Sequence, residues 1–139
     1  LFDHFGAFFN GFYFADVFAT FAYAYDSNSD RIISETFPNG LTTTRSYGGN
    51  VQDEALLQIT HQVGATSISR FIYGWDIPAS RISTWSQQAG VQPPSVHSFG
   101  YDAADQLITA TVTNAGLLIN TYAYSYDLAD NRLTEQVGA

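Results

Sequence analysis

The chain contains no cysteine, no methionine and no lysine, so its five basic residues are all arginine. The absence of cysteine excludes disulfide bonds and thiolate metal sites. Thirteen acidic residues outnumber the arginines and give a formal net charge of −8 over 139 residues. Because binding to nucleic acid or to an anionic membrane surface needs a basic surface, this charge argues against both kinds of partner.

Long uninterrupted hydrophobic runs are also lacking. The most aromatic stretch, residues 1–20, is broken by four polar residues, which argues against a membrane span. They are Asp3, His4, Asn10 and Asp16. No basic residues precede this stretch, as a secretory signal peptide would require. The first residue, Leu1, indicates a fragment or a processed product.

What the chain does have is phenylalanine at its beginning, since eight of its eleven phenylalanines lie within residues 1–21. Residues 11–25 are apolar on both faces of an extended strand, a pattern typical of a strand covered on both sides. A helical stripe over residues 5–12 also fits, but Gly6 and Gly11 weaken a helix. We expect residues 1–20 to form a strand and an interface with another chain or another part of a longer chain. The interface residues are Phe8, Phe12, Phe14 and Phe18.

Four later segments share one layout. They read FAYAYDSNSDRI at 21–32, FIYGWDIPASRI at 71–82, HSFGYDAADQL at 97–107 and YAYSYDLADNRL at 122–133. Each has ring side chains at three alternate positions, then Asp, a short turn, Arg or Gln, and a branched apolar residue. Self-similarity at a period of about 20–50 residues is the signature of a stacked array of one supersecondary unit.

One unit reads as one β-hairpin. Side chains at alternate positions of a strand share a face, so each ring triplet lies on one side and small residues lie on the other. Three to five residues rich in Asp, Asn, Ser or Pro then fit a hairpin turn. Because a lone hairpin is barely stable in water, the stacked array is the folding unit.

The spacing of the repeated Asp positions locates the units. They stand at 26, 76, 102 and 127, and the double first step hides a weaker copy in which the strand at 42–47 enters a turn after Tyr47. A further copy is conceivable at residues 2–6. We therefore predict a repeat array over 21–139, with units near 21–46, 47–70, 71–96, 97–121 and 122–139.

The layout resembles the YD-repeat, or Rhs, family, whose motif reads roughly Tyr-Asp-x-x-Gly-Asn-Arg-Leu-Thr. Residues 126–134, YDLADNRLT, match it with Asp130 in place of Gly, and residues 101–107, YDAADQL, match a form that is one residue shorter. The repeated motif residues are Tyr25, Asp26, Arg31, Trp75, Asp76, Arg81, Tyr101, Asp102, Tyr126, Asp127 and Arg132.

The resemblance implies a spiral β-sheet. Members of the family build hollow shells around a toxic cargo in bacterial polymorphic toxins and insecticidal toxin complexes, and part of an adhesion ectodomain in teneurins. This chain departs from the pattern because the turn glycine is missing from its four clear copies. The family's C-terminal shell-closing and self-cleavage signature is absent too, so those roles do not carry over.

Candidate sites in the sequence all have a structural interpretation. Residues 26–30, DSNSD, begin like a calcium loop, but Arg31 and Phe37 occupy positions that need Gly and Glu. Asp and Arg recur five residues apart and could face each other across each turn, and their repetition favours a structural role over acid–base catalysis. The three histidines, His4, His61 and His97, lack metal-ligand spacing. We therefore expect no catalytic residue, no metal site and no cofactor.

The sequence thus predicts an all-β protein of five or six stacked β-hairpins in a curled or spiral antiparallel sheet. The expected function is non-enzymatic and structural, as a shell or scaffold segment of an Rhs-like surface or secreted protein. One alternative is a filament subunit that joins copies of itself head to tail. Another is a carbohydrate-binding or adhesion module, since ring ladders can stack on sugars. Partners would be other copies, the rest of a longer chain, or glycans, outside the cell or at its surface.

Overall fold

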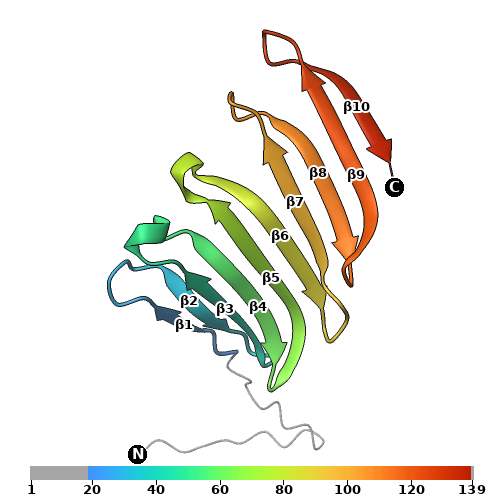
Figure 1. The fold of residues 1–139 in the computed structure, drawn as a ribbon. Helices are drawn as coiled ribbons and strands as arrows, with labels where there is room; N and C mark the ends of the chain where they lie inside the picture. Colours follow the sequence, from blue (N-terminus) through green and yellow to red (C-terminus); the bar gives the residue numbers. More distant parts are fainter. Residues whose placement is uncertain (1–18, 139) are drawn as a thin grey trace, which may run out of the picture.

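The computed structural model describes residues 19–138, which form one antiparallel sheet with its ten strands side by side in chain order (Figure 1). The strands are β1 (Ala22–Tyr25), β2 (Ile32–Thr36), β3 (Leu41–Tyr47), β4 (Leu56–Val63), β5 (Thr66–Asp76), β6 (Arg81–Ala89), β7 (Ser95–Tyr101), β8 (Leu107–Asn114), β9 (Leu117–Tyr126) and β10 (Arg132–Gly138). Two 3-10 turns, Asn50–Gln52 and Ile77–Ala79, lie between strands. The predicted all-β fold of stacked hairpins in a curled sheet is confirmed.

The predicted interface residues Phe8, Phe12, Phe14 and Phe18, and the strand expected before residue 19, lie outside the described residues. Within residues 19–138, no helix is long and apolar enough to cross a membrane.

The two faces of the sheet differ because side chains alternate along each strand. One row of cross-strand partners runs through Tyr73, Trp85, His97 and Val112. We call this side the ring face. The next row, on the opposite face, runs through Gly74, Thr84, Ser98 and Thr111 and carries only small side chains.

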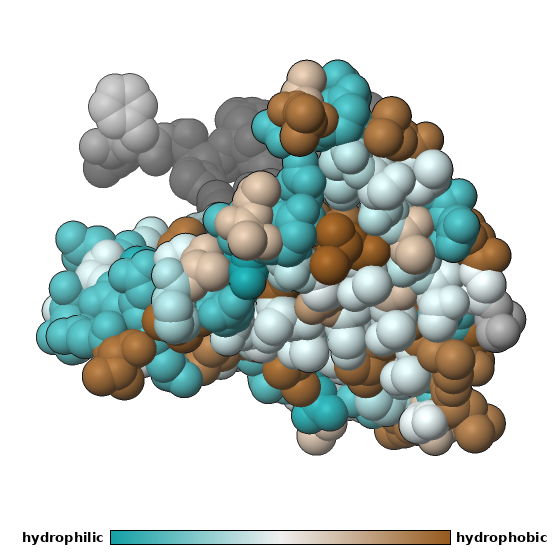
Figure 2. All heavy atoms as spheres, turned by 45° about the horizontal axis from the view of Figure 1, so that its top comes forward, coloured by the Kyte–Doolittle hydropathy of each residue, from teal (hydrophilic) through white to brown (hydrophobic). Residues whose placement is uncertain are grey.

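The sheet is a single layer. Only two of the described residues are nearly inaccessible: Ala110 is 7% exposed and Thr43 is 3% exposed. Most rings of β5, β7 and β9 are half-buried because their neighbours on the same face cover their sides. Figure 2 shows hydrophobic side chains at the surface among polar ones. Among residues 19–138 nothing covers either face, so contacts between neighbouring hairpins must supply much of the stability.

All five hairpins contain the same irregularity. Just after the turn, the second strand carries one residue more than its partner, which is a β-bulge. The extra residues are Ile33, Leu57, Ser83, Ile108 and Leu133. Because a bulge bends its strand and increases the local twist, five bulges in the same place promote the curvature of the sheet.

The motif-bearing connections gather at one end of the sheet (Figure 1). They join β1 to β2, β3 to β4, β5 to β6, β7 to β8 and β9 to β10, and we call them the motif turns. The pairs of strands that they join are hairpins 1 to 5. Since the strands run up and down in chain order, every motif turn is adjacent to the next, and their side chains can form contacts from turn to turn.

Candidate functional site at the motif turns

Four of the five motif turns hold one residue in the left-handed backbone conformation, and the turn between β3 and β4 holds two, Asp53 and Glu54. Asp30, Ser80, Asp105 and Asp130 have φ values of 52°, 50°, 62° and 64°. Asp130 stands where the YD-repeat motif has glycine, the residue best suited to positive φ. Asp is among the few other residues that visit this conformation at modest cost. The turn geometry therefore survives without the glycine.

The motif Asp of three turns binds the backbone of its own turn. Asp26 Oδ1 accepts the Asn28 N–H at 2.9 Å. Asp102 Oδ1 accepts two turn N–H groups, both at 2.9 Å, and Asp127 Oδ1 accepts two at 2.8 and 2.9 Å. These carboxylates fix the turns, as Asx-type side chains do.

Hydrogen bonds also shift the titration of two of these carboxyls. The Asn131 side chain, then the Asn131 and Ala129 N–H groups, hold the pKa of Asp127 below its ordinary value. The Asn28 N–H and then the Ser29 hydroxyl lower the pKa of Asp26. Donors that favour the charged form have this effect.

The expected pairing of Asp and Arg across each turn holds at only one turn. Asp76 Oδ2 accepts Nε and pairs with Nη2 of Arg81, both at 3.0 Å. Arg31 pairs instead with Glu54 of the next hairpin, and Arg132 pairs with Glu135 of its own strand. At these two turns the carboxylates of Asp26 and Asp127 bind turn amides instead.

Contacts between hairpins repeat from junction to junction. At each junction, the last ring before the motif turn donates a hydrogen bond to a main-chain carbonyl oxygen of the preceding hairpin. The acceptor lies at the start of the second strand of that hairpin. The bonds are Tyr47 to Ile32 at 3.3 Å, Trp75 to Leu56 at 2.8 Å, Tyr101 to Ile82 at 2.7 Å and Tyr126 to Leu107 at 2.9 Å. One donor thus spans each of the four junctions, and the Trp75 indole serves as well as a phenol.

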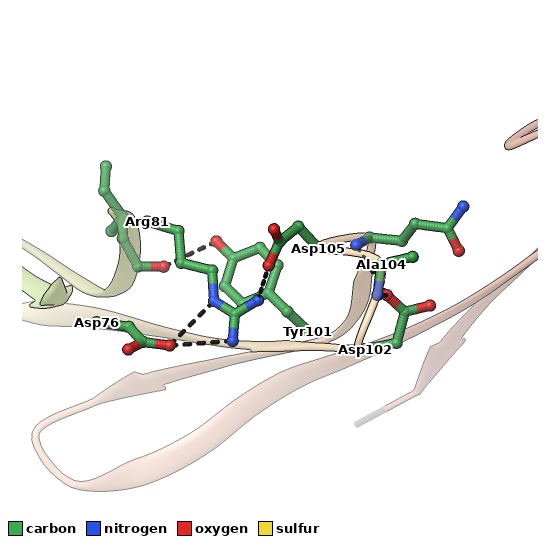
Figure 3. Close-up of polar contacts among 8 residues, drawn as sticks. Asp76, Arg81, Tyr101, Asp102, Ala104 and Asp105 are labelled. Carbon is green, nitrogen blue, oxygen red and sulfur yellow. Dashed lines mark hydrogen bonds and ion pairs between the residues drawn. The ribbon is translucent and has the colours of Figure 1, made fainter. Parts of the chain in front are cut away.

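A polar side chain from the preceding turn strengthens three of these junctions. Arg81 lies 4.7 Å from the centre of the Tyr101 ring and pairs with Asp105 in the next turn (Figure 3). Arg31 lies 5.2 Å from the Tyr47 ring centre and 3.2 Å from Glu54. In the third case, Gln106 Nε2 donates to Asp130 Oδ1 at 2.6 Å. We call the ring-to-carbonyl bond and this turn-to-turn contact together the clamp.

Direct contacts between rings of different hairpins are few among the described residues. Among the described residues, the close ring contacts within the array include Trp85–His97 at 4.7 Å and Tyr122–Tyr124 at 6.5 Å between centroids. Six rings from the triplets of β5, β7 and β9 are all half-buried. They are Tyr73, Trp75, Phe99, Tyr101, Tyr124 and Tyr126. What recurs across hairpins is the polar end of the ring rather than its face.

Two histidines lie within the described residues, and both have structural contacts. His61 Nδ1 is 2.9 Å from the Thr43 hydroxyl, and His97 lies against Trp85. No group of histidine and acidic side chains within residues 19–138 is placed to hold a metal ion.

Shallow grooves lie between the motif turns. The groove between the first two has a volume of about 280 Å³ and is lined by residues that include Asp26, Arg31, Arg45 and Glu54. Its charged groups are paired within the fold, since Arg31 binds Glu54 and Arg45 binds Glu35 at 3.1 Å. The Asp26 carboxylate at the same groove accepts hydrogen bonds from the Asn28 N–H and the Ser29 hydroxyl.

Sequence reasoning found the motif residues but missed what they bind. Glu54, Asp105 and Asp130 receive the contact from the preceding turn, and none had been singled out for that role. One signal was present: the last ring is Tyr or Trp in every copy, whereas Phe and His occur only at the earlier ring positions. Because only rings that carry a hydrogen-bond donor occur at this position, each repeat is expected to use that donor.

No protein-family model and no curated protein matches the sequence. Among solved structures, the crystal structure of TcdB2-TccC3-TEV contains a similar chain, with a TM-score of 0.68 and 18% sequence identity. The match covers 86% of this chain and 7% of that chain. The two proteins share a fold, and this chain corresponds in length to a small part of the larger one.

Proposed function

We propose that this chain is a non-enzymatic structural protein, a shell or scaffold segment of an Rhs-like surface or secreted protein. The observation that carries the proposal is the repetition of the ring-to-carbonyl bond at all four junctions. The residues that could be mistaken for catalytic groups are engaged in fixing turns or in joining hairpins. A wall of joined hairpins is what such an arrangement builds.

The comparisons support the same proposal from another direction. The sequence motif resembles YD repeats, and the fold matches part of a chain in the TcdB2-TccC3-TEV structure. Both support a secreted or surface location for a wall built of such hairpins. The two open faces and the near absence of a buried core suit a wall better than an enclosed catalytic domain.

Negative-stain electron microscopy of the native material tests the proposal. A shell or scaffold segment should give hollow shells or curved walls, while filaments would favour the head-to-tail alternative. A set of compact single particles that turn over a substrate would contradict both. In parallel, Asp→Asn variants at positions 26, 76, 102 and 127 should show no loss of catalytic activity that is separable from unfolding.

The carbohydrate-binding alternative retains one supporting observation. Tyr122 and Tyr124 lie parallel, with 6° between their ring planes, on the uncovered ring face. Parallel phenol rings on an open face can stack on sugars. Binding of a glycan array by the intact chain, abolished by Tyr124→Ala with the fold retained, would favour this alternative.

A further inference from the structure

The two outer strands present the two unused halves of the clamp. At one edge, Tyr25 is 56% exposed, and its hydroxyl has no acceptor within residues 19–138. Its place in hairpin 1 is that of Tyr101 in hairpin 4, which binds the carbonyl of the preceding hairpin. Asp30 has the left-handed conformation of Asp105 and Asp130, the residues that accept from the preceding turn.

The opposite edge holds the matching groups. Arg132 pairs with Tyr126 at the same register position where Ile82 pairs with Trp75, so its carbonyl oxygen is the next acceptor in the series. The residue after the left-handed position, which is Arg81 in hairpin 3 and Gln106 in hairpin 4, is Asn131 in hairpin 5. The Arg132 side chain is 55% exposed, and its guanidinium lies 5.7 Å from the centre of the Tyr124 ring of its own hairpin.

The backbone pairing between hairpins follows one register. The residue after the bulge always pairs with the residue three positions before the last ring of the next triplet. The four pairs are Ser34 with Thr44, Gln58 with Ile72, Thr84 with Ser98 and Thr109 with Ala123. By the same rule, Thr134 of β10 is set to pair with the residue three before Tyr25, which is Ala22 of β1. Both edge strands are exposed along their whole length.

We propose that β10 of one copy pairs with β1 of a second copy, head to tail, with Thr134 opposite Ala22. The Tyr25 hydroxyl of the second copy donates to the Arg132 carbonyl oxygen, and Asn131, at the position of Gln106, faces Asp30 of the second copy. The exposed edges supply the strand pairing. This inference rests on the non-enzymatic structural role proposed above, takes the head-to-tail alternative for its assembly, and names the partner as another copy of the chain. Repetition of this contact gives an open fibre unless its rotation closes a ring.

Cysteine cross-linking tests the register directly, because the chain has no cysteine of its own. Facing residues of antiparallel strands have Cα atoms about 4.5–5.5 Å apart, within the about 4.4–6.8 Å that a disulfide spans. The variant Ala22→Cys/Thr134→Cys should form a ladder of disulfide-linked dimers and higher oligomers on oxidation. The matched control, Ala22→Cys/Gln136→Cys, keeps the same face but is two residues out of register, and should cross-link at least about tenfold less. Equal cross-linking of the two variants, or none in either, overturns the proposal.

Removal of the Tyr25 hydroxyl tests the side-chain contact in the full chain by sedimentation velocity. Tyr25→Phe should weaken association about threefold to tenfold, because it deletes the donor to the Arg132 carbonyl oxygen of the neighbouring copy. Tyr23→Phe is the matched control and should associate as the unmodified chain does. An unmodified chain that stays monomeric, or a Tyr25→Phe chain that associates as strongly as Tyr23→Phe, overturns the inference. Either result leaves the structural function standing as long as the internal clamps still stabilise each monomer.

Discussion

The Tyr101 hydroxyl donates a 2.7 Å hydrogen bond to the main-chain carbonyl oxygen of Ile82, across the junction between hairpins 3 and 4. Its equivalents at the other junctions join every hairpin to the preceding one. Only two residues of this single-layer sheet, among those that the structure describes, are nearly inaccessible. Such contacts therefore supply part of the stability that a buried core would otherwise provide. The repeated motif is therefore best understood as a joint.

Arg81 is the most connected residue of the clamps, and its replacement should destabilise the fold. It pairs with Asp76 and Asp105 and stacks on Tyr101. Because the side chain is 26% exposed, we expect Arg81→Gln to lower the free energy of unfolding by about 1–2 kcal/mol, with a smaller effect at high salt. Denaturant titrations at low and high salt measure this.

The control for Arg81→Gln is Arg70→Gln, because the exposed Arg70 side chain donates to Gln88 on the face opposite the rings. It should change the free energy of unfolding by less than about 0.5 kcal/mol. Equal effects of the two substitutions would remove the clamp as their explanation.

Gly74 should not tolerate a side chain. A Cβ at this position would lie 2.2 Å from the Thr84 hydroxyl oxygen on the neighbouring strand. We expect Gly74→Ala to cost about 1–2 kcal/mol, and the double variant Gly74→Ala/Thr84→Ala to recover much of it. Gly49→Ala is the control, since a Cβ there has no neighbour within 4 Å among the described atoms. A double variant no more stable than Gly74→Ala would show that Thr84 is not the cause.

Acid should loosen the outer motif turns through Asp26 and Asp127. Both have a folded-state pKa below the ordinary value, so their contribution to stability is present above the unfolded-state pKa and is lost as pH falls through the folded-state pKa. The acid limb of the stability curve, below about pH 4, should therefore become shallower in Asp127→Asn. The exposed Asp53 lies outside these turns, and Asp53→Asn is the control. Unfolding measured from pH 2 to pH 7 checks this, and an unchanged acid limb in Asp127→Asn would contradict it.

Local pattern was enough to predict the elements of this fold. Alternating rings such as Tyr122, Tyr124 and Tyr126 are read directly as one face of a strand, and the Asp that follows marks the turn. The contacts between turns were beyond such a reading. Asp105 pairs with Arg81, which lies 24 residues earlier in the chain. Their proximity can be inferred only when the register of the strands between them is known.

The bulges set that register, and nothing in the sequence marks them. Ile33, Leu57, Ser83, Ile108 and Leu133 look like ordinary strand residues. At two turns where Asp and Arg could have paired, Asp26 and Asp127 bind local amides instead. The donor-bearing ring at the end of each triplet was visible in the sequence, but its acceptor was not.

Removal of one hydroxyl tests the central claim most directly, and the measurement is the free energy of unfolding of Tyr101→Phe against that of Tyr23→Phe. Tyr101→Phe deletes the donor to the Ile82 carbonyl oxygen and leaves the ring, so we expect a loss of about 1–2 kcal/mol. Tyr23 is 53% exposed, and its hydroxyl has no partner within residues 19–138, so its replacement should cost less than about 0.5 kcal/mol. A Tyr101→Phe protein as stable as Tyr23→Phe would contradict the claim that these rings join the hairpins.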